Sequence, residues 1–168
     1  MAPRRLSLAA RARAIRMVLL DVDGVLTDGG LYYSAEGQEL KRFHAHDGYG
    51  IRRGKEAGLT FGIISGRSTP IVEARAKVLS IEEVVQGAED KVLAMREIQR
   101  RHGYRDAEFA FIGDDLFDIP LLRAVGLSAA PTNALPRVKR VVHYVTRVAG
   151  GEGAVRDFVD MILAYRGI

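Results

Sequence analysis

The amino-acid sequence predicts an α/β protein with a Rossmann-like, three-layer parallel sheet. Short apolar runs, typical of buried strands, alternate almost throughout with longer amphipathic stretches, typical of helices. Such alternation calls for right-handed crossovers, which place helices on both faces of a parallel sheet. The chain has 168 residues, of which 48% are hydrophobic, enough to bury a sizeable core. We therefore expect a single domain over residues 1–168, without an internal repeat or a long linker.

The expected elements follow in chain order. Residues 16–20 are apolar on both faces after the first residue, which predicts a buried strand. Short strands over 31–33 and 39–43 flank a Ser-Ala-Glu-Gly turn, so we expect a β-hairpin flap at about 29–44. The remaining patterns predict strands over 59–64, 83–86, 108–112, 127–130 and 144–146, and helices over 48–57, 70–79, 88–102, 119–125 and 153–165.

The hairpin carries aromatic side chains that the sheet cannot bury. Tyr32 and Tyr33 lie on its first strand, and the edge of that strand has unpaired backbone groups. An exposed apolar strand edge is a liability for a monomer, because it can pair with another chain. We therefore expect the hairpin to contact other subunits of a homo-oligomer.

Composition excludes several classes of function. The chain has no cysteine, which excludes a disulfide framework, a thiolate zinc site and a cysteine nucleophile, and is compatible with a cytoplasmic location. No apolar run reaches membrane-spanning length, so we expect no membrane partner. The basic segment 1–11 has too short an apolar core for a signal peptide, and we expect a frayed leader or a short helix there.

The net charge of +4 raises the question of a nucleic-acid partner. Arginines are spread along the chain beside 21 acidic residues, without an RNP-like, zinc-finger or helix-turn-helix pattern. This distribution favours a solvated surface of mixed charge, and an anionic small substrate is equally compatible with it. We expect no nucleic-acid binding; the alternative of a basic nucleic-acid binder requires salt-sensitive binding to DNA or RNA.

The end of the first strand is the most informative stretch of the chain. There an apolar run changes into two carboxylates, Asp21 and Asp23, and Gly24 allows the backbone to turn sharply after them. Open α/β sheets bind ligands beyond the carboxyl ends of their strands, so an acidic pair at this place suits a hard cation and a phosphorylated substrate. The alternative is an ordinary Asp-Gly turn after a strand.

Two further strands end in polar residues, Ser65-Gly66-Arg67 and Gly113-Asp114-Asp115. Because the carboxyl ends of parallel strands lie at one edge, these residues could converge with the first acidic pair. Two groups of aspartates there form an oxygen site that suits Mg²⁺. One aspartate can attack phosphorus to form an aspartyl-phosphate, and a carboxylate two residues on can protonate the leaving alcohol and later activate water. The alternatives are a turn at Ser65 and a helix cap at Asp114-Asp115.

A phosphoryl group in transfer also needs hydroxyl, backbone N–H and cationic partners. Ser65, Gly66 and Lys91 are residues of these types. On charge alone Lys91 fits a surface lysine at the start of a helix. Its occurrence together with the strand-end residues favours a place in the site.

Four motifs, in this order, resemble those of the haloacid dehalogenase superfamily of phosphotransferases. They are Asp21-Val22-Asp23-Gly24-Val25, Ser65-Gly66, Lys91 and Gly113-Asp114-Asp115-Leu116-Phe117-Asp118. From about residue 15 onward the chain is similar, more narrowly, to the 3-deoxy-D-manno-octulosonate 8-phosphate phosphatases, a capless branch. This second likeness is carried by Asp28-Gly29, Phe43-His44, Asp47-Gly48-Tyr49-Gly50-Ile51-Arg52, Ser65-Gly66-Arg67, Gln86-Gly87, Thr146-Arg147 and Gly150-Gly151-Glu152-Gly153-Ala154-Val155-Arg156.

The resemblance implies a Mg²⁺-dependent phosphatase that releases 3-deoxy-D-manno-octulosonate for lipopolysaccharide sugar synthesis through an aspartyl-phosphate. Asp21 would be the nucleophile, and Asp23 the acid/base that also gives its backbone carbonyl to Mg²⁺. Asp114 would be the remaining metal ligand from the protein. The other site residues implied are Ser65 and Lys91 on the phosphoryl group, and Asp115 and Asp118 around the metal ligands.

The resemblance also implies a sugar-acid pocket and a homotetramer whose hairpins form a central barrel. The pocket would be lined by His44, Ala45, His46, Asp47, Gly48, Arg52, Gly66, Arg67, Arg75 and Lys91. A neighbour's C-terminal Gly-Gly segment would close the site in place of a cap domain. The chain departs from the family in having His46 where arginine is usual, and in its short tail.

Two alternatives stay open within this fold. One is a phosphatase of a nine-carbon sugar acid 9-phosphate, of the sialic-acid type; Arg67 favours the eight-carbon substrate, because the nine-carbon enzymes tend to have an acidic residue there. The other is a non-catalytic assembly module. The presence of every motif residue opposes it.

Overall fold

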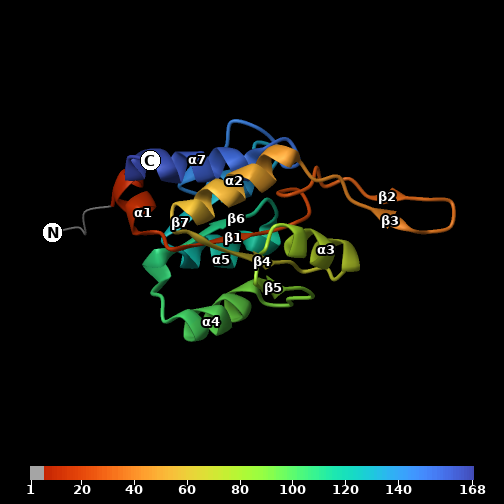
Figure 1. The fold of residues 1–168 in the computed structure, drawn as a ribbon, viewed down its shortest axis with the longest axis horizontal. Coiled ribbons are helices and arrows are strands. Elements are labelled where there is room, and N and C mark those ends of the chain that lie inside the picture. Colours follow the sequence, from red (N-terminus) through yellow and green to blue (C-terminus); the bar gives the residue numbers. More distant parts are fainter. Residues whose placement is uncertain (1–5) are drawn as a thin grey trace.

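The computed structural model describes residues 6–168 and contains a six-stranded sheet in the order β5-β4-β1-β6-β7-β8. Figure 1 shows helices above and below this sheet and a two-stranded hairpin that extends away from it. The sheet consists of β1 (Met17–Leu20), β4 (Thr60–Ile64), β5 (Glu83–Val85), β6 (Phe109–Ile112), β7 (Leu127–Ala130) and β8 (Tyr144–Val145), and the hairpin of β2 (Tyr32–Tyr33) and β3 (Glu39–Leu40). The helices are α1 (Leu8–Ala14), α2 (Ala45–Glu56), α3 (Pro70–Val78), α4 (Lys91–His102), α5 (Ile119–Ala124), α6 (Pro136–Lys139) and α7 (Ala154–Arg166), with 3₁₀ turns η1 (Asp106–Glu108) and η2 (Leu116–Asp118).

Strand β1 lies inside the sheet, since its four residues are apolar and fully buried. Met17 of this strand pairs in parallel with Thr60 of β4 on one side and with Phe109 of β6 on the other. The chain adds β4 and β5 on the first side and then β6, β7 and β8 on the second, so the order of construction reverses between β1 and β6. Ligands of open parallel sheets bind at such a switch point, beyond the carboxyl ends of the strands. The topology therefore places a site where β1 and β6 end.

The two faces of the sheet pack against different helices. Val18 and Leu20 point into the core that contains residues of α1, α2, α3 and α7, whereas Met17 and Leu19 point into the core formed with α4, α5 and α6. This alternation along one strand separates the helices into two layers. Figure 1 shows α2 and α7 of the first layer above the sheet and α4 of the second below it. The predicted three-layer arrangement is confirmed.

The predicted hairpin is present and lies outside these layers. Strands β2 and β3 are antiparallel, with Tyr32 opposite Leu40, and a bridge between Thr27 and Phe43 closes the base. The side chains near its tip are exposed, Tyr33 by 58% and Leu40 by 62%. The expected contact of this hairpin with other subunits stays a prediction.

The observed elements differ from the expected ones mainly at their ends. The helix expected over 88–102 begins at Lys91, because the Asp90 carboxylate caps it by accepting hydrogen bonds from the N–H groups of Val92 and Leu93. The helix expected from residue 48 begins at Ala45, after His44. Both shifts bring predicted site residues to the first turn of a helix.

Two segments, helix α6 and the N-terminal segment, need separate comparison with the expected elements. Helix α6 was not predicted, because its four residues are too few for a hydrophobic period to be visible. Of the N-terminal segment, Leu8–Ala14 form a short helix, as one of the two expectations had it. The expectation for residues 1–5 lies outside the described residues.

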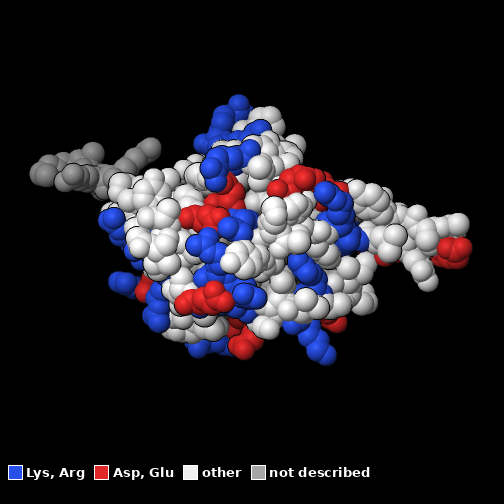
Figure 2. Space-filling model, turned by 45° about the horizontal axis from the view of Figure 1, so that its top comes forward, with Lys and Arg blue, Asp and Glu red and all other residues white. Residues whose placement is uncertain are grey.

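The surface carries both signs of charge. Figure 2 shows basic and acidic side chains interspersed on one face. Several of these side chains form ion pairs. For example, Arg101 pairs with Glu83 and holds the pKa of the Glu83 carboxyl below its usual range. This distribution agrees with the expected solvated surface. None of the helices within residues 6–168 is long and apolar enough to cross a membrane.

Candidate active site

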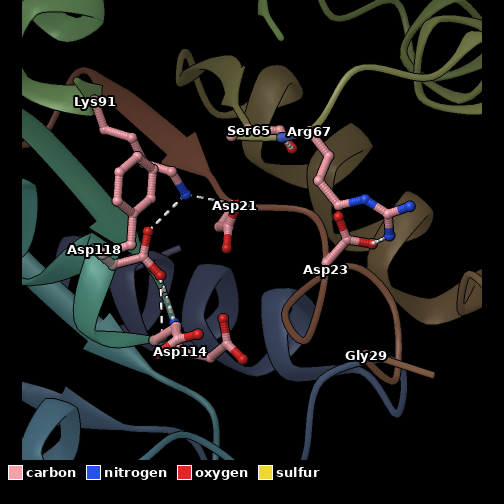
Figure 3. A pocket seen from close by; sticks show the side chains of 11 residues that line it. Asp21, Asp23, Gly29, Ser65, Arg67, Lys91, Asp114 and Asp118 are labelled. Carbon is pink, nitrogen blue, oxygen red and sulfur yellow. Dashed lines mark hydrogen bonds and ion pairs between the residues drawn. The ribbon is translucent and has the colours of Figure 1, made fainter. Parts of the chain in front are cut away.

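Side chains at the ends of β1, β4 and β6 surround a cavity of about 300 Å³. Asp21 directly follows β1, Ser65 directly follows β4, and Asp114 lies two residues beyond β6. Because these strands are parallel neighbours, the three side chains lie together, as Figure 3 shows. The cavity is lined by Asp21, Asp23, Gly29, Ser65, Gly66, Arg67, Lys91, Asp114, Asp115, Phe117 and Asp118.

The loop after β1 is held by close packing. Gly24 has a φ of +86°, and a Cβ at this position would lie 2.1 Å from Oδ2 of Asp114. A Cβ on Gly150 would lie 1.9 Å from the carbonyl oxygen of Gly24. Asn133 donates a hydrogen bond to that carbonyl at 3.0 Å and accepts one from the N–H of Gly150 at 2.7 Å. The segments after β7 and β8 therefore fix the loop that carries Asp23.

Three carboxylates meet where the strand order reverses. Asp21, Asp114 and Asp118 each offer an oxygen, and these oxygens lie within 4.8 Å of one another. Burial, together with the charge of Asp118, raises the pKa of Asp21 to about 6. Burial and the neighbouring carboxylates raise the pKa of Asp114 to about 7. A cation at this place would relieve the repulsion, and an all-oxygen donor set fits Mg²⁺.

Lys91 provides the positive charge of this cluster. Its ammonium group donates hydrogen bonds to Asp21 at 2.8 Å and to Asp118 at 2.6 Å, and its side chain is only 4% exposed. Burial acts to lower the pKa of Lys91, but the two carboxylates outweigh it and raise that pKa. The alternative of a surface lysine is therefore wrong: the first turn of α4 points this residue into the site.

Asp118 connects the lysine to the loop after β6. One of its oxygens accepts the hydrogen bond from Lys91, and the other accepts the N–H groups of Asp114 at 2.9 Å and Asp115 at 3.1 Å. The carboxylate is buried. It therefore fixes the backbone beside Asp114, as Figure 3 shows.

Ser65 and Arg67 complete the cavity on the β4 side. Ser65 is buried, and its hydroxyl accepts a hydrogen bond from the N–H of Arg67 at 3.2 Å. The Arg67 guanidinium lies at the mouth, 3.9 Å from Oδ1 of Asp23 and 2.8 Å from a carboxylate oxygen of Glu39. This side of the site thus presents a hydroxyl and a cation to an anionic ligand.

Most of the residues predicted for the sugar-acid pocket lie elsewhere. Gly66, Arg67 and Lys91 line the cavity, but the other seven do not: His44, Ala45, His46, Asp47, Gly48, Arg52 and Arg75. They lie directly before α2, on α2 and on α3 beside it, where a Cβ on Gly48 would lie 3.1 Å from Arg75. Arg52 faces a separate groove between the two helices.

Gly29, which lines the cavity, was not predicted as a site residue. Nor were four residues whose side chains make contacts in or around the site: Glu39, Lys41, Phe117 and Asn133. Phe117 lies inside the fourth motif, and its ring is 5.4 Å from the Lys91 ammonium. That position could have been inferred from its place between two aspartates. The other three reach the site through contacts between distant parts of the chain, for which the local sequence has no signal.

A buried carboxylate beside a lysine, a serine and a cation site, at the switch point of a parallel sheet, defines the class of phosphoryl-transfer hydrolases. The family model of the haloacid dehalogenase-like hydrolases matches residues 79–158. The 3-deoxy-D-manno-octulosonate 8-phosphate phosphatase KdsC of Escherichia coli K12 is 42% identical over 158 residues, which cover 94% of this chain and 84% of that protein.

Solved structures of phosphatases of this family are similar to this chain. The crystal structure of a probable YrbI family phosphatase from Pseudomonas syringae has a TM-score of 0.93 and 46% identity, covering 95% of this chain and 91% of that one. The Moraxella catarrhalis 3-deoxy-D-manno-octulosonate 8-phosphate phosphatase, in complex with magnesium, phosphate and the sugar acid, has a TM-score of 0.91 and 37% identity, covering 94% and 90%. The chain belongs to the haloacid dehalogenase-like hydrolases and, within them, to the family of 3-deoxy-D-manno-octulosonate 8-phosphate phosphatases.

Proposed function

We propose that this protein hydrolyses 3-deoxy-D-manno-octulosonate 8-phosphate to the free sugar acid and phosphate, in the synthesis of the lipopolysaccharide sugar. The observation that carries the proposal is the Asp21 carboxylate, which is buried at the floor of the cavity and hydrogen-bonded to Lys91. Solved structures of phosphatases with this activity in their name share the fold of this chain, with TM-scores of 0.91 to 0.93. The fold itself does not select the substrate.

In the first step an oxygen of Asp21 attacks phosphorus and the bond from phosphorus to the sugar oxygen breaks. Lys91, which contacts Asp21, holds an equatorial phosphoryl oxygen, and Ser65 with the N–H of Gly66 holds another. Asp23 gives its proton to the sugar oxygen as that oxygen leaves. The products of this step are the free sugar acid and an aspartyl-phosphate on Asp21.

In the second step water replaces the carboxylate. Asp23, now ionised, takes a proton from water as the water oxygen attacks phosphorus, and the bond between phosphorus and Asp21 breaks. The burial of Asp118 and its hydrogen bonds to the loop after β6 keep Lys91 and Asp114 in place through both steps. Inorganic phosphate then leaves through the mouth of the cavity.

Mg²⁺ is the cofactor that these residues would hold. Asp21, Asp114 and the backbone carbonyl of Asp23 are the proposed protein ligands, and Asp118 and Asp115 support them. When bound, Mg²⁺ neutralises charge on the phosphoryl group and on the carboxylates around it. Without it, burial and then repulsion within the cluster raise the pKa values of Asp21 and Asp114.

The sugar-acid end of the substrate requires cations, and Arg67 at the mouth is the first of them. The other residues of the expected pocket, among them His44, His46 and Arg75, do not line the cavity of their own chain. We infer that a neighbouring copy completes the pocket in a cytoplasmic homotetramer assembled through the hairpins. The exposed Tyr33 and Leu40 on the hairpin support such a contact.

The experiment is a measurement of phosphate release from the eight-carbon sugar acid 8-phosphate and from a nine-carbon sugar acid 9-phosphate, with Mg²⁺ and with a chelator. We expect a higher kcat/KM for the eight-carbon substrate, loss of turnover with the chelator and recovery when Mg²⁺ is added back. Preference for the nine-carbon substrate would overturn the assignment of the sugar. Turnover that survives chelation would overturn the metal site, and absence of turnover on every sugar phosphate would leave an assembly module.

A further inference from the structure

A lysine at the base of the hairpin contacts a residue of the proposed active site. Lys41 follows β3 directly, and its side chain is only 1% exposed, although Leu40 beside it is 62% exposed. The Lys41 ammonium donates a hydrogen bond to Oδ1 of Asp23 and lies 3.3 Å from a carboxylate oxygen of Glu39. A buried ammonium is costly unless it is paired, so these two carboxylates account for its position.

Four charges alternate around the mouth of the cavity. Asp23 contacts Lys41, Lys41 contacts Glu39, Glu39 accepts a hydrogen bond from Arg67 at 2.8 Å, and Arg67 lies 3.9 Å from Asp23. Two of the four residues come from the hairpin, one from the loop after β1 and one from the loop after β4. The base of the hairpin is therefore joined to the residue proposed as the acid/base.

Both cations approach the same oxygen of Asp23. Lys41 and Arg67 are close to Oδ1, whereas none of the hydrogen bonds found among residues 6–168 involves Oδ2. Holding one oxygen of a carboxylate fixes its plane and leaves the other oxygen available for proton transfer. A misplacement of about 1 Å at such a group can cost about 100-fold in rate.

We propose that Lys41 is a positioning residue that holds Oδ1 of Asp23, so that Oδ2 meets the leaving oxygen of the substrate. This inference rests on the proposed function, because it takes Asp23 as the group that protonates the leaving oxygen. It assigns the hairpin a part in the chemistry of its own subunit, in addition to any contact with other subunits. Lys41 itself transfers no proton in this scheme.

The test uses two leaving groups that differ in their need for a proton. A sugar alkoxide must be protonated as it leaves, whereas p-nitrophenolate is stable as an anion. The ratio kcat/KM reports the steps up to formation of the aspartyl-phosphate, in which this difference is felt. We expect Lys41→Met to lower kcat/KM about 100-fold for the sugar-acid phosphate and less than about 3-fold for p-nitrophenyl phosphate. Lys41→Arg should be intermediate.

Two controls separate positioning from other roles. Lys55→Met removes a lysine whose hydrogen bonds, among the described residues, go only to the backbone carbonyls of Leu79 and Ser80, and it should change neither value by more than about 2-fold. In an Asp23→Asn background, Lys41→Met should have almost no further effect, because the two residues act as one unit. Thermal unfolding followed by circular dichroism shows whether each variant is folded; if Lys41→Met is not, Lys41→Arg carries the comparison.

The outcomes are distinct. Equal losses for both leaving groups, or no loss, would overturn the proposal, and a full loss in the Asp23→Asn background would assign Lys41 to direct substrate binding instead. If the wild type does not hydrolyse the sugar-acid phosphate, the proposed substrate fails. The same ratio is then measured with the alkyl phosphate that the enzyme does hydrolyse.

Discussion

Two groups of predicted site residues behave differently in the structure. The strand-end cluster, which consists of Asp21, Ser65, Lys91, Asp114 and Asp118, surrounds one cavity. The α2 group, which consists of His44, His46, Gly48, Arg52 and Arg75, lies on α2, α3 and the residue before α2, and lines no part of that cavity. The first group is mostly buried, whereas the second is mostly partly or fully exposed.

The difference reflects what positions each group. The strand-end residues are placed by parallel strands whose register is fixed by hydrogen bonds and by apolar packing on both faces. The α2 group is placed by two helices outside the sheet, and the position of its side chains relative to a substrate depends on which molecule contacts this surface. We propose that the first group carries the chemistry common to all phosphoryl transfer and that the second determines the choice of the sugar.

The largest effect is expected from Asp21→Asn. The amide cannot act as the nucleophile, so kcat should fall by about 10⁴-fold or more, while the fold is kept because a buried charge is replaced by a neutral group of the same shape. Steady-state phosphate release and circular dichroism check the two statements. Asp106→Asn is the control, since Asp106 pairs with Arg96 and does not line the cavity; its activity should stay within about 2-fold. An active Asp21→Asn protein would mean that another carboxylate attacks phosphorus.

Lys91→Met should produce the next largest effect. It removes a phosphoryl contact and should lower kcat by roughly 10²–10³-fold. It also leaves Asp21 and Asp118 without their shared cation, so the metal-free protein should lose about 3 kcal/mol of unfolding free energy, measured in urea. Lys55→Met should change neither quantity strongly. A small change for Lys91→Met would place this lysine outside the chemistry despite its burial.

The contrast between the groups also shows what the sequence can predict. The class of fold and the convergence at the sheet edge follow from apolar runs that end in Asp21, Ser65 and Gly113-Asp114, because strand ends of a parallel sheet have few possible arrangements. The burial of Lys91 could be inferred from its occurrence together with the strand-end residues, and not from its charge alone. Lys41 and Asn133 could not be predicted, since their contacts join segments that only the finished fold brings together.

Arginine variants test whether residues outside the strand-end cluster bind the sugar-acid end of the substrate. Arg67→Ala should raise KM about 10-fold with a smaller change in kcat, because it removes one charge-assisted contact to the substrate. Arg75→Ala should have a similar effect if a neighbouring copy provides this side chain. Mixing Arg75→Ala protein with Asp21→Asn protein should then restore activity, because a mixed oligomer contains sites with an intact Asp21 and an intact neighbour. Mixtures that only sum the separate activities would contradict a shared pocket.

The smallest effect concerns Asp47, at the start of α2. Its Oδ1 accepts the N–H of Arg156 at 2.8 Å, its Oδ2 is buried without a partner, and burial raises its pKa to about 6. The folded state therefore binds a proton that the unfolded state releases near pH 4, so wild-type stability should fall as pH rises from about 4 to about 6. Asp47→Asn should remove up to about 3 kcal/mol of this change, measured by urea unfolding at several pH values.

The control for this experiment has the opposite sign. Arg96 lowers the pKa of Asp106, so that residue contributes stability above pH about 4 that is lost as pH falls further. Asp106→Asn should therefore leave the change between pH 4 and pH 6 intact. A wild-type slope that Asp47→Asn does not alter would show that Asp47 is hydrated or paired in solution.

The most direct test of the central claim is to trap the covalent intermediate. The enzyme is mixed with Mg²⁺ and the sugar-acid phosphate, quenched in acid within the first turnover and treated with borohydride, which reduces an aspartyl-phosphate to homoserine. Peptide mass mapping then locates the change. The mechanism predicts homoserine at position 21 and at no other aspartate. Modification at Asp23 or Asp114, or turnover without any modified aspartate, would contradict it.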